Sequence, residues 1–206
     1  MKVYFIRHGQ SDSNSRREHG GWGQYSLTEQ GRKEAEVAGK RLEGLSFDKV
    51  FTSDLIRTIE TQQIALPGAQ IEQSSLIREI DVGSLVGRTA DDCYAEFGDS
   101  YIANKRVYDF SAYGGETYDQ FCERVRKFVT ELEKCSYESV AIFCHGGMIL
   151  TMMDIILGFT VQNKYVLRCP NCGVFVFEFT GKSWQLDTWN YRGDITLENT
   201  DKDAIL

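Results

Sequence analysis

Two histidines of this chain follow short apolar runs in matching surroundings. His8 stands in "FIRHGQS" and His145 in "IFCHGGM", and in both stretches the apolar run ends at the histidine and a glycine follows it. Glycine allows the backbone to turn sharply and to come close to a ligand. Either histidine alone would be explained as an ordinary polar residue at a strand end whose hydrogen bonds are satisfied. Because the chain has only three histidines, two in one shared context favour a common functional role.

Arginines and a carboxylate accompany these histidines. Arg7 directly precedes His8, Arg57 lies in "TSDLIRTIETQ", and "LIREIDVG" contains Glu79, which spacing alone does not separate from Asp81. Arginines can hold phosphoryl oxygens, a neutral imidazole can act as a nucleophile, and a carboxylic acid can protonate the leaving oxygen. A neighbouring arginine also disfavours protonation of the imidazole. These residue types predict phosphoryl transfer that needs no metal ion.

Hydrophobic periodicity predicts the elements that must position these residues. The expected strands are 3–6, 47–53, 139–144, 173–179 and 183–190, and the expected helices are 27–45, 53–66, 88–98, 116–134 and 148–157. Thr28 is expected to cap the first helix, and Ser53 or Asp54 the second. The glycines and polar residues between these runs predict the connecting turns.

Strands that alternate with helices predict an α/β fold. We expect a three-layer α/β/α domain over residues 1–206, with a mainly parallel central sheet flanked by helices and a small inserted lid at about 81–115. Ligands bind such sheets at the carboxyl ends of the strands. His8, Arg57 and His145 all follow expected strands, so they should meet at this edge.

Composition and charge narrow the range of partners. The formal net charge is −7 and no run of lysines or arginines forms a basic stripe, which argues against a nucleic-acid partner. An anionic substrate must then be held by a few local cations. The first apolar run covers only residues 3–6, too short for a signal peptide, and the other apolar stretches are too short or too interrupted to span a bilayer. We therefore expect a cytoplasmic protein that does not bind a membrane.

The six cysteines are expected to be reduced thiols, given the absence of a secretion signal. "CPNC" at 169–172 has the spacing of half a zinc site, but no second pair completes it. We expect a turn there that leads into a strand, and neither a metal ion nor a cofactor.

Six motifs occur in the order and approximate spacing typical of one family. They are "RHGQSDSN", "SLTEQGRKEA", "SDLIRTIETQ", "LIREIDVGSLVG", "YGGETYDQF" and "FCHGGMI". An R-H-G tripeptide alone is weak evidence, whereas six ordered motifs are specific. From Arg7 to about Gly147, the chain resembles the histidine phosphatase superfamily, the phosphoglycerate mutase-like proteins.

The resemblance implies a role for each matching residue. His8 would be the nucleophile that becomes phosphorylated, with Glu79 as the proton donor for the leaving alcohol. The phosphoryl oxygens would be bound by Arg7, Arg57 and His145, with further substrate contacts from Ser11, Asn14 and Gly146. The implied substrate is a small phosphorylated molecule, and both a monomer and a homodimer stay open.

Within this family the sequence favours a phosphatase over a mutase. Mutases that use 2,3-bisphosphoglycerate resemble "ERHYG" followed by a basic insertion, whereas here "REIDVGSLVGRT" leads into the acidic "ADDCYAEFGDS". The alternatives are a cofactor-dependent phosphoglycerate mutase and an α-ribazole phosphate phosphatase. For the latter, Leu85 and Val86 replace the Trp and Glu of the usual G-x-W-E-G. A phosphate-binding module without turnover and a metallohydrolase using both histidines are the rivals from other classes.

Overall fold

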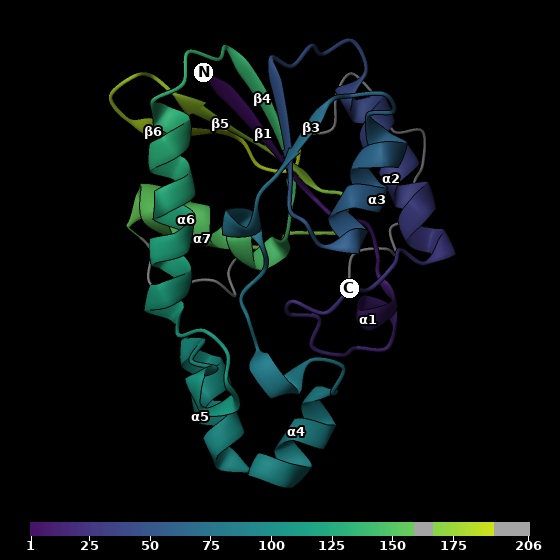
Figure 1. The fold of residues 1–206 in the computed structure, drawn as a ribbon, viewed down its shortest axis with the longest axis vertical. Coiled ribbons are helices and arrows are strands. Elements are labelled where there is room, and N and C mark those ends of the chain that lie inside the picture. Colours follow the sequence, from purple (N-terminus) through teal and green to yellow (C-terminus); the bar gives the residue numbers. More distant parts are fainter. Residues whose placement is uncertain (159–166, 192–206) are drawn as a thin grey trace.

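A six-stranded sheet lies at the centre of the computed structural model, which describes residues 1–158 and 167–191 (Figure 1). The strand order is β3-β2-β4-β1-β5-β6. The strands are β1 (Lys2–Arg7), β2 (Lys49–Thr52), β3 (Ile71–Gln73), β4 (Ser139–Cys144), β5 (Val174–Phe179) and β6 (Trp184–Thr188). The pairs β1–β4, β2–β4 and β2–β3 are parallel, whereas β1–β5 and β5–β6 are antiparallel. The sheet is therefore mixed, with its parallel part in the strands that lead to the histidines and Arg57.

Helices cover both faces of this sheet, which confirms the expected three-layer fold. They are α1 (Asp12–Ser15), α2 (Glu29–Leu42), α3 (Ile56–Ala65), α4 (Ala90–Phe97), α5 (Asp99–Val107), α6 (Tyr118–Glu133) and α7 (Gly146–Leu157). Helices α2 and α3 lie on one face, and α6 and α7 on the other (Figure 1). In the parts of the chain that the structure describes, no helix combines the length and the apolar character that crossing a membrane requires.

The central strand β1 supplies side chains to two separate cores. Val3 and Phe5 join the cluster that includes α6 and α7, whereas Tyr4 and Ile6 join the cluster that includes α2 and α3. Since both faces are covered, the strand reads as a continuous apolar run instead of an alternating one. The strand is thus held rigidly up to the residue before His8.

Of the two predicted helix caps, one is confirmed and the other is wrong. Thr28 caps α2 as expected, accepting a hydrogen bond from the amide of Gly31 at 3.1 Å. The expected cap of the next helix is wrong, because α3 begins at Ile56 and its N-cap residue is Leu55, with no side-chain cap bond. The Asp54 carboxylate pairs with Arg78 instead. The amide of Ile56 at the start of α3 donates to Gln24 Oε1 at 3.0 Å, so a residue distant in sequence takes the place of the expected cap.

The segment 81–115 holds more helix than expected. Instead of one helix over 88–98, α4 and α5 follow each other, and Gly98 between them has a φ of +56°. The two helices project beyond the three-layer body (Figure 1). Tyr101, Phe110 and Tyr113 are buried in the same core cluster as α6. These aromatic side chains pack the segment onto the domain.

Candidate active site

The ends of β1 and β4 bring the two histidines together. Arg7 and Cys144 are partners in the parallel ladder, so the next residue of each strand is a histidine at the same level of the sheet. The rings of His8 and His145 have centroids 5.2 Å apart. The amide of His8 also donates to the carbonyl of Cys144 at 3.0 Å. The two motifs that looked alike in the sequence thus form one site.

The hydrogen bonds of His8 define which ring nitrogen is free to react. Nδ1 lies 2.7 Å from the carbonyl oxygen of Gly9, and Nε2 lies 3.2 Å from Nε of Arg57. A carbonyl only accepts and a guanidinium only donates, so Nδ1 carries the proton and Nε2 presents its lone pair. Burial, followed by the charges of Arg57 and Arg7, holds the pKa of His8 well below its ordinary value. The imidazole is therefore neutral, as a nucleophile must be.

Arg57 is fixed in place by backbone carbonyls. It follows β2 in the first turn of α3, and its two terminal nitrogens donate to the carbonyls of Gly23 and Gly21, each at 2.9 Å. The side chain is only 2% exposed, and burial lowers its pKa to about 10. It still carries its charge at neutral pH, so the site holds a preorganised cation directly beside the nucleophile.

Arg7 and His145 offer buried polar atoms without partners. Nη1 of Arg7 donates to the carbonyl of Cys169, but among residues 1–158 and 167–191 its Nε has no hydrogen-bond partner, and neither ring nitrogen of His145 has one. Burial, followed by the positive charge of Arg57, the neighbouring His8 ring and the positive charge of Arg7, holds the pKa of His145 well below its ordinary value. Buried polar groups normally find partners, and exceptions mark a functional site. The N–H of Arg7 Nε and the N–H of the His145 ring can donate to the oxygens of a phosphoryl group bound beside His8.

Glu79 lies against the start of α7, directly after His145. Its Oε2 accepts the amide of Gly147 at 3.0 Å, and its Oε1 accepts the amide of Ile80 at 2.9 Å. Asp81 has a different task, since its Oδ1 accepts the amide of Gly83 at 2.9 Å within a turn. The geometry therefore favours Glu79 as the acid, a choice that spacing alone left open.

The glycine pair at the start of α7 leaves room for the charged side chains. A Cβ at Gly147 would lie 2.0 Å from Oε1 of Glu79, and one at Gly146 would lie 3.3 Å from Nε of Arg7. Contacts below 3 Å force a neighbour to move. The close approach of Glu79 to the helix thus depends on glycine.

Ser11 and Asn14 shape the loop that follows the nucleophile. They form a capping box at α1, in which the Ser11 hydroxyl accepts the Asn14 amide at 3.4 Å and Asn14 Oδ1 accepts the Ser11 amide at 3.2 Å. Asn14 Oδ1 also accepts from the side-chain amide of Asn171 at 3.3 Å. Their contact with a substrate phosphate stays a prediction.

The "CPNC" segment forms the expected turn and supports the nucleophile, which sequence reasoning did not anticipate. The Asn171 side chain and the Cys172 amide both donate to the carbonyl of His8, at 3.0 and 3.3 Å, and Cys169 accepts from Arg7. Within residues 1–158 and 167–191, no three His, Cys, Asp or Glu side chains are grouped to hold a metal ion. The turn thus acts through the side chain of Asn171 and through the backbone of Cys169 and Cys172.

Two further residues that sequence reasoning missed contact the backbone of Glu79. Trp22 Nε1 donates to the Glu79 carbonyl at 2.8 Å, and Arg124 Nη2 donates to the same oxygen at 3.1 Å. Two signals mark these residues in the sequence, although neither indicates the contact with Glu79. Trp22 stands among glycines in "GGWG", and Arg124 directly precedes the buried Val125 of an amphipathic helix.

Comparisons with known proteins show the family to which this chain belongs. The family model of the histidine phosphatase superfamily (branch 1) matches residues 3–192. A 2,3-bisphosphoglycerate-dependent phosphoglycerate mutase from Brucella ovis is 34% identical over 171 residues, which are 78% of this chain and 83% of the relative.

Solved structures of two phosphatases superpose on the fold. The alpha-ribazole phosphatase from Shigella flexneri has a TM-score of 0.86 at 24% identity, covering 97% of this chain and 100% of that one. A mycobacterial glucosyl-3-phosphoglycerate phosphatase has a TM-score of 0.81 at 26% identity, covering 92% of this chain and 98% of the other. The match of the family model over most of the chain confirms the resemblance seen in the motifs: this protein belongs to the histidine phosphatase superfamily.

Proposed function

We propose that this protein is a phosphomonoester hydrolase whose His8 becomes phosphorylated during turnover. The observation that carries the proposal is the neutral Nε2 of His8, 3.2 Å from Arg57 Nε and beside the unpartnered nitrogens of Arg7 and His145. A nucleophile surrounded by fixed positive groups is what phosphoryl transfer requires, because the reaction depends on positioning and charge stabilisation. These side chains supply both without a metal ion.

The first step transfers the phosphoryl group from the ester to His8. Nε2 forms a bond to phosphorus while the ester P–O bond breaks, and Glu79 gives a proton to the departing alcohol oxygen. Arg7 and Arg57 hold the non-bridging oxygens. A dianion bound beside His145 opposes the effects that lower the pKa of this ring, so His145 can take up a proton and donate to the same oxygens.

The second step returns the enzyme to its starting state. Glu79, now a carboxylate, takes a proton from a water molecule whose oxygen attacks phosphorus. The N–P bond breaks, inorganic phosphate leaves, and His8 is neutral again. All residues of this cycle come from one chain, so a monomer and a homodimer suit the mechanism equally. The six free cysteines suit the reducing cytoplasm, where we place the reaction.

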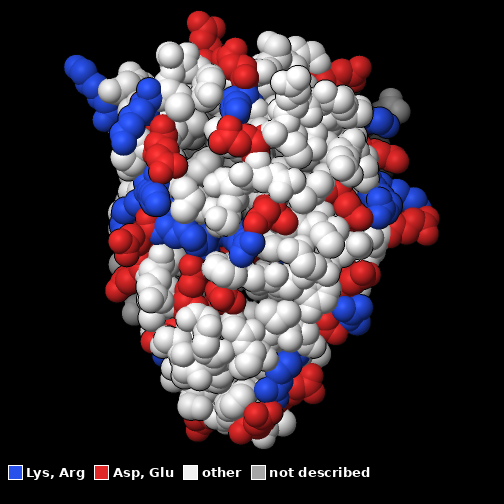
Figure 2. Space-filling model, viewed as in Figure 1, with Lys and Arg blue, Asp and Glu red and all other residues white. Residues whose placement is uncertain are grey.

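The charges around the lid segment support a hydrolase for esters with a weakly charged alcohol. Arg78 is paired with Asp54, and Arg88 with Glu96. On the face drawn in Figure 2, basic side chains are interspersed with acidic ones. A second acidic group on the substrate would have to compete with these carboxylates for an arginine. A small phosphorylated metabolite with a single phosphate is therefore the substrate class we propose.

A phosphoglycerate mutase is the second candidate, favoured by the 34% identity to the Brucella relative. α-Ribazole phosphate is a candidate substrate for the hydrolase, suggested by the Shigella enzyme of similar fold. One observation argues against α-ribazole phosphate as the substrate. Leu85, which replaces the Trp of the usual motif, is fully buried and so belongs to the packing of the loop. Assays on both compounds separate the candidates.

The decisive experiment is to trap the phosphoenzyme. Incubation with p-nitrophenyl phosphate, followed by a quench without acid, should give one phosphate on His8, and His8→Ala should lack both the phosphate and the activity. Hydrolysis that persists in His8→Ala would refute the mechanism. A phosphoglycerate interconversion faster than hydrolysis, measured with 2,3-bisphosphoglycerate present, would make the protein a mutase.

A further inference from the structure

We propose that Arg124 is a positioning residue, which Glu116 and Trp22 assist. It holds the backbone of Glu79 so that the carboxyl group lies where it can transfer a proton. The inference rests on the proposed function, since it assigns a task to residues outside the reacting atoms. Its basis is a set of hydrogen bonds that converge on the backbone around Glu79. That backbone lies between a short 3₁₀ helix, η1 (Ser75–Ile77), and the lid segment 81–115.

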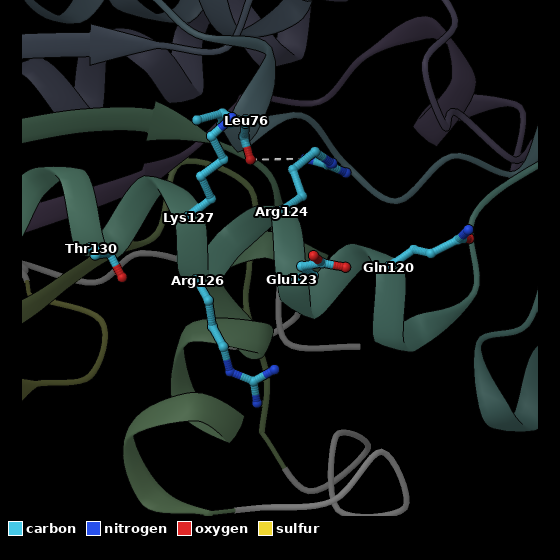
Figure 3. Close-up of a pocket in the computed structure, with 7 residues that line it drawn as sticks. All are labelled: Leu76, Gln120, Glu123, Arg124, Arg126, Lys127 and Thr130. Carbon is cyan, nitrogen blue, oxygen red and sulfur yellow. Dashed lines mark hydrogen bonds between the residues drawn. The ribbon is translucent and has the colours of Figure 1, made fainter.

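Arg124 reaches from α6 to several carbonyls of the segment before Glu79. Nη1 donates to the carbonyls of Leu76 at 2.9 Å and Arg78 at 3.1 Å, with a longer contact of 3.4 Å to Ser75. Nη2 donates to the carbonyl of Glu79 itself at 3.1 Å. Figure 3 shows the guanidinium directed toward Leu76, while Arg126 of the same helix points away from it. One planar cation thus ties the approach to Glu79 to a packed helix.

Glu116 extends the same connection to the other side of Glu79. Arg124 donates to both Glu116 oxygens, each at 2.8 Å, and the side chains of this pair are only 13% and 16% exposed. Glu116 Oε2 in turn accepts the amide of Asp81 at 2.9 Å. The carbonyl of residue 79 and the amide of residue 81 are therefore both tied to one ion pair.

Trp22 completes the arrangement from the loop that also holds Arg57. Its indole Nε1 donates to the Glu79 carbonyl at 2.8 Å, and the Arg78 and Arg124 guanidinium carbons lie 4.7 and 5.8 Å from its ring centroid. The Glu79 carbonyl thus accepts two hydrogen bonds. The loop that positions Arg57 beside His8 and the helix that carries Arg124 meet at this one oxygen.

Such a connection matters because proton transfer depends steeply on distance. The Glu79 carboxylate itself is held only by the amides of Gly147 and Ile80 among the contacts described, so its place relative to His8 follows the backbone. A shift of about 1 Å in a reacting group can cost about 10²-fold in rate. A displaced Glu79 should therefore lower the rate of hydrolysis for esters whose leaving group must be protonated. Esters whose leaving group departs without protonation should be affected less.

The test compares an ester that needs the acid with one that does not. The variants are Arg124→Lys, which keeps a cation but not the planar set of donors, and Trp22→Phe, which removes one N–H and keeps an aromatic ring. Arg126→Lys is the matched control, since Arg126 lies on the same helix and none of the hydrogen bonds described above joins it to the backbone around Glu79. Both arginines line a surface groove of about 530 Å³ (Figure 3). The readout is kcat/KM for glycerol 2-phosphate and for p-nitrophenyl phosphate, because this parameter covers the steps up to ester cleavage.

We expect Arg124→Lys to lower the ratio of alkyl to aryl kcat/KM by at least about tenfold, Trp22→Phe by about threefold, and Arg126→Lys not at all. In a Glu79→Gln background, where the acid is already gone, Arg124→Lys should leave the ratio unchanged. Equal losses on both esters, or an undiminished effect in the Glu79→Gln background, would overturn the proposal. If Arg124→Lys fails to fold by circular dichroism, Trp22→Phe decides by the same criterion. Failure of the proposed function is a separate result, namely hydrolysis by His8→Ala.

Discussion

Arg57 Nε donates to Nε2 of His8 at 3.2 Å, from a guanidinium whose other nitrogens are held by the carbonyls of Gly21 and Gly23. The lone pair that would attack phosphorus is thus covered by a fixed cation in the substrate-free site. The same cation is the second cause, after burial, of the lowered pKa of His8. Arg57 and His8 are therefore coupled electrostatically.

Replacing Arg57 by glutamine should affect both the rate and the pH profile. The loss of one preorganised charge should lower kcat/KM by about 10²- to 10³-fold. Because Arg57 lowers the pKa of His8, its removal should raise that pKa, and the acid limb of the pH profile should move to higher pH. The profile of kcat/KM on p-nitrophenyl phosphate measures both. An acid limb that stays in place would show that Arg57 does not control the protonation of His8.

The stability of the fold should decrease as the pH falls through the acid range. His8 and His145 are buried histidines whose pKa values lie well below the ordinary histidine value of about 6.5. Above about pH 6.5 both are neutral in the folded and unfolded states, so they contribute no pH dependence. Below it, the unfolded chain binds the protons first, and each histidine lowers the free energy of unfolding by up to about 1.4 kcal/mol per pH unit until its folded pKa is reached.

Urea denaturation of the protein at pH 7 and pH 5 measures this effect against a matched variant. Carboxylates such as Asp54, whose pKa is lowered by Arg78, act in the same direction at lower pH, so the comparison must remove one histidine. His145→Asn should lose less stability between the two pH values than the parent does. An equal loss in both proteins would mean that His145 does not titrate in this way.

The proximity of His8 and His145 could be predicted from the sequence because it follows from the geometry of parallel strands. A buried run that ends at "RHG" and another that ends at "CHGG" place their next residues at one edge when the strands are parallel neighbours, and the Arg7–Cys144 register does so. The choice between Glu79 and Asp81 could not be made, because their segment has no periodicity. The contact of the Glu79 carboxylate with the Gly147 amide at the start of α7 supports Glu79 as the acid, and this role stays a proposal.

Other features left no readable pattern. Helix α5 was missed because only Tyr101 of its residues is buried, so it lacks an apolar stripe. The contacts of Trp22 and Arg124 go to backbone carbonyls, and a carbonyl is present at every position of a chain. Only the fold selects which of them an arginine or an indole can reach.

A chelator test separates the proposed mechanism from a metallohydrolase that uses both histidines. We expect prolonged dialysis against EDTA to leave kcat for p-nitrophenyl phosphate within about twofold, because His8 attacks directly and charge stabilisation comes from Arg7, Arg57 and His145. Zinc and magnesium added back after dialysis serve as the control. Activity that disappears on chelation and returns with one metal would support the metallohydrolase instead.

The glycine at the start of α7 allows a test that separates helix stability from activity. Alanine is a better helix former than glycine by about 1 kcal/mol, so Gly147→Ala should not destabilise α7 itself. Its Cβ, however, would lie 2.0 Å from Oε1 of Glu79, and the carboxylate must move. We expect kcat/KM for glycerol 2-phosphate to fall by at least about 10²-fold, with a smaller loss for p-nitrophenyl phosphate.

Gly146→Ala is the neighbouring comparison, because its Cβ would meet Arg7 Nε at 3.3 Å and no atom of Glu79 is among its nearest neighbours. A change there disturbs a phosphate ligand and spares the acid, so both esters should suffer alike. Thermal unfolding of the two variants shows whether the fold is intact. If Gly147→Ala lowers both esters equally, as Gly146→Ala is expected to do, then the Gly147 contact does not serve proton transfer. The selective loss at one glycine and the uniform loss at the next would together place the acid at Glu79.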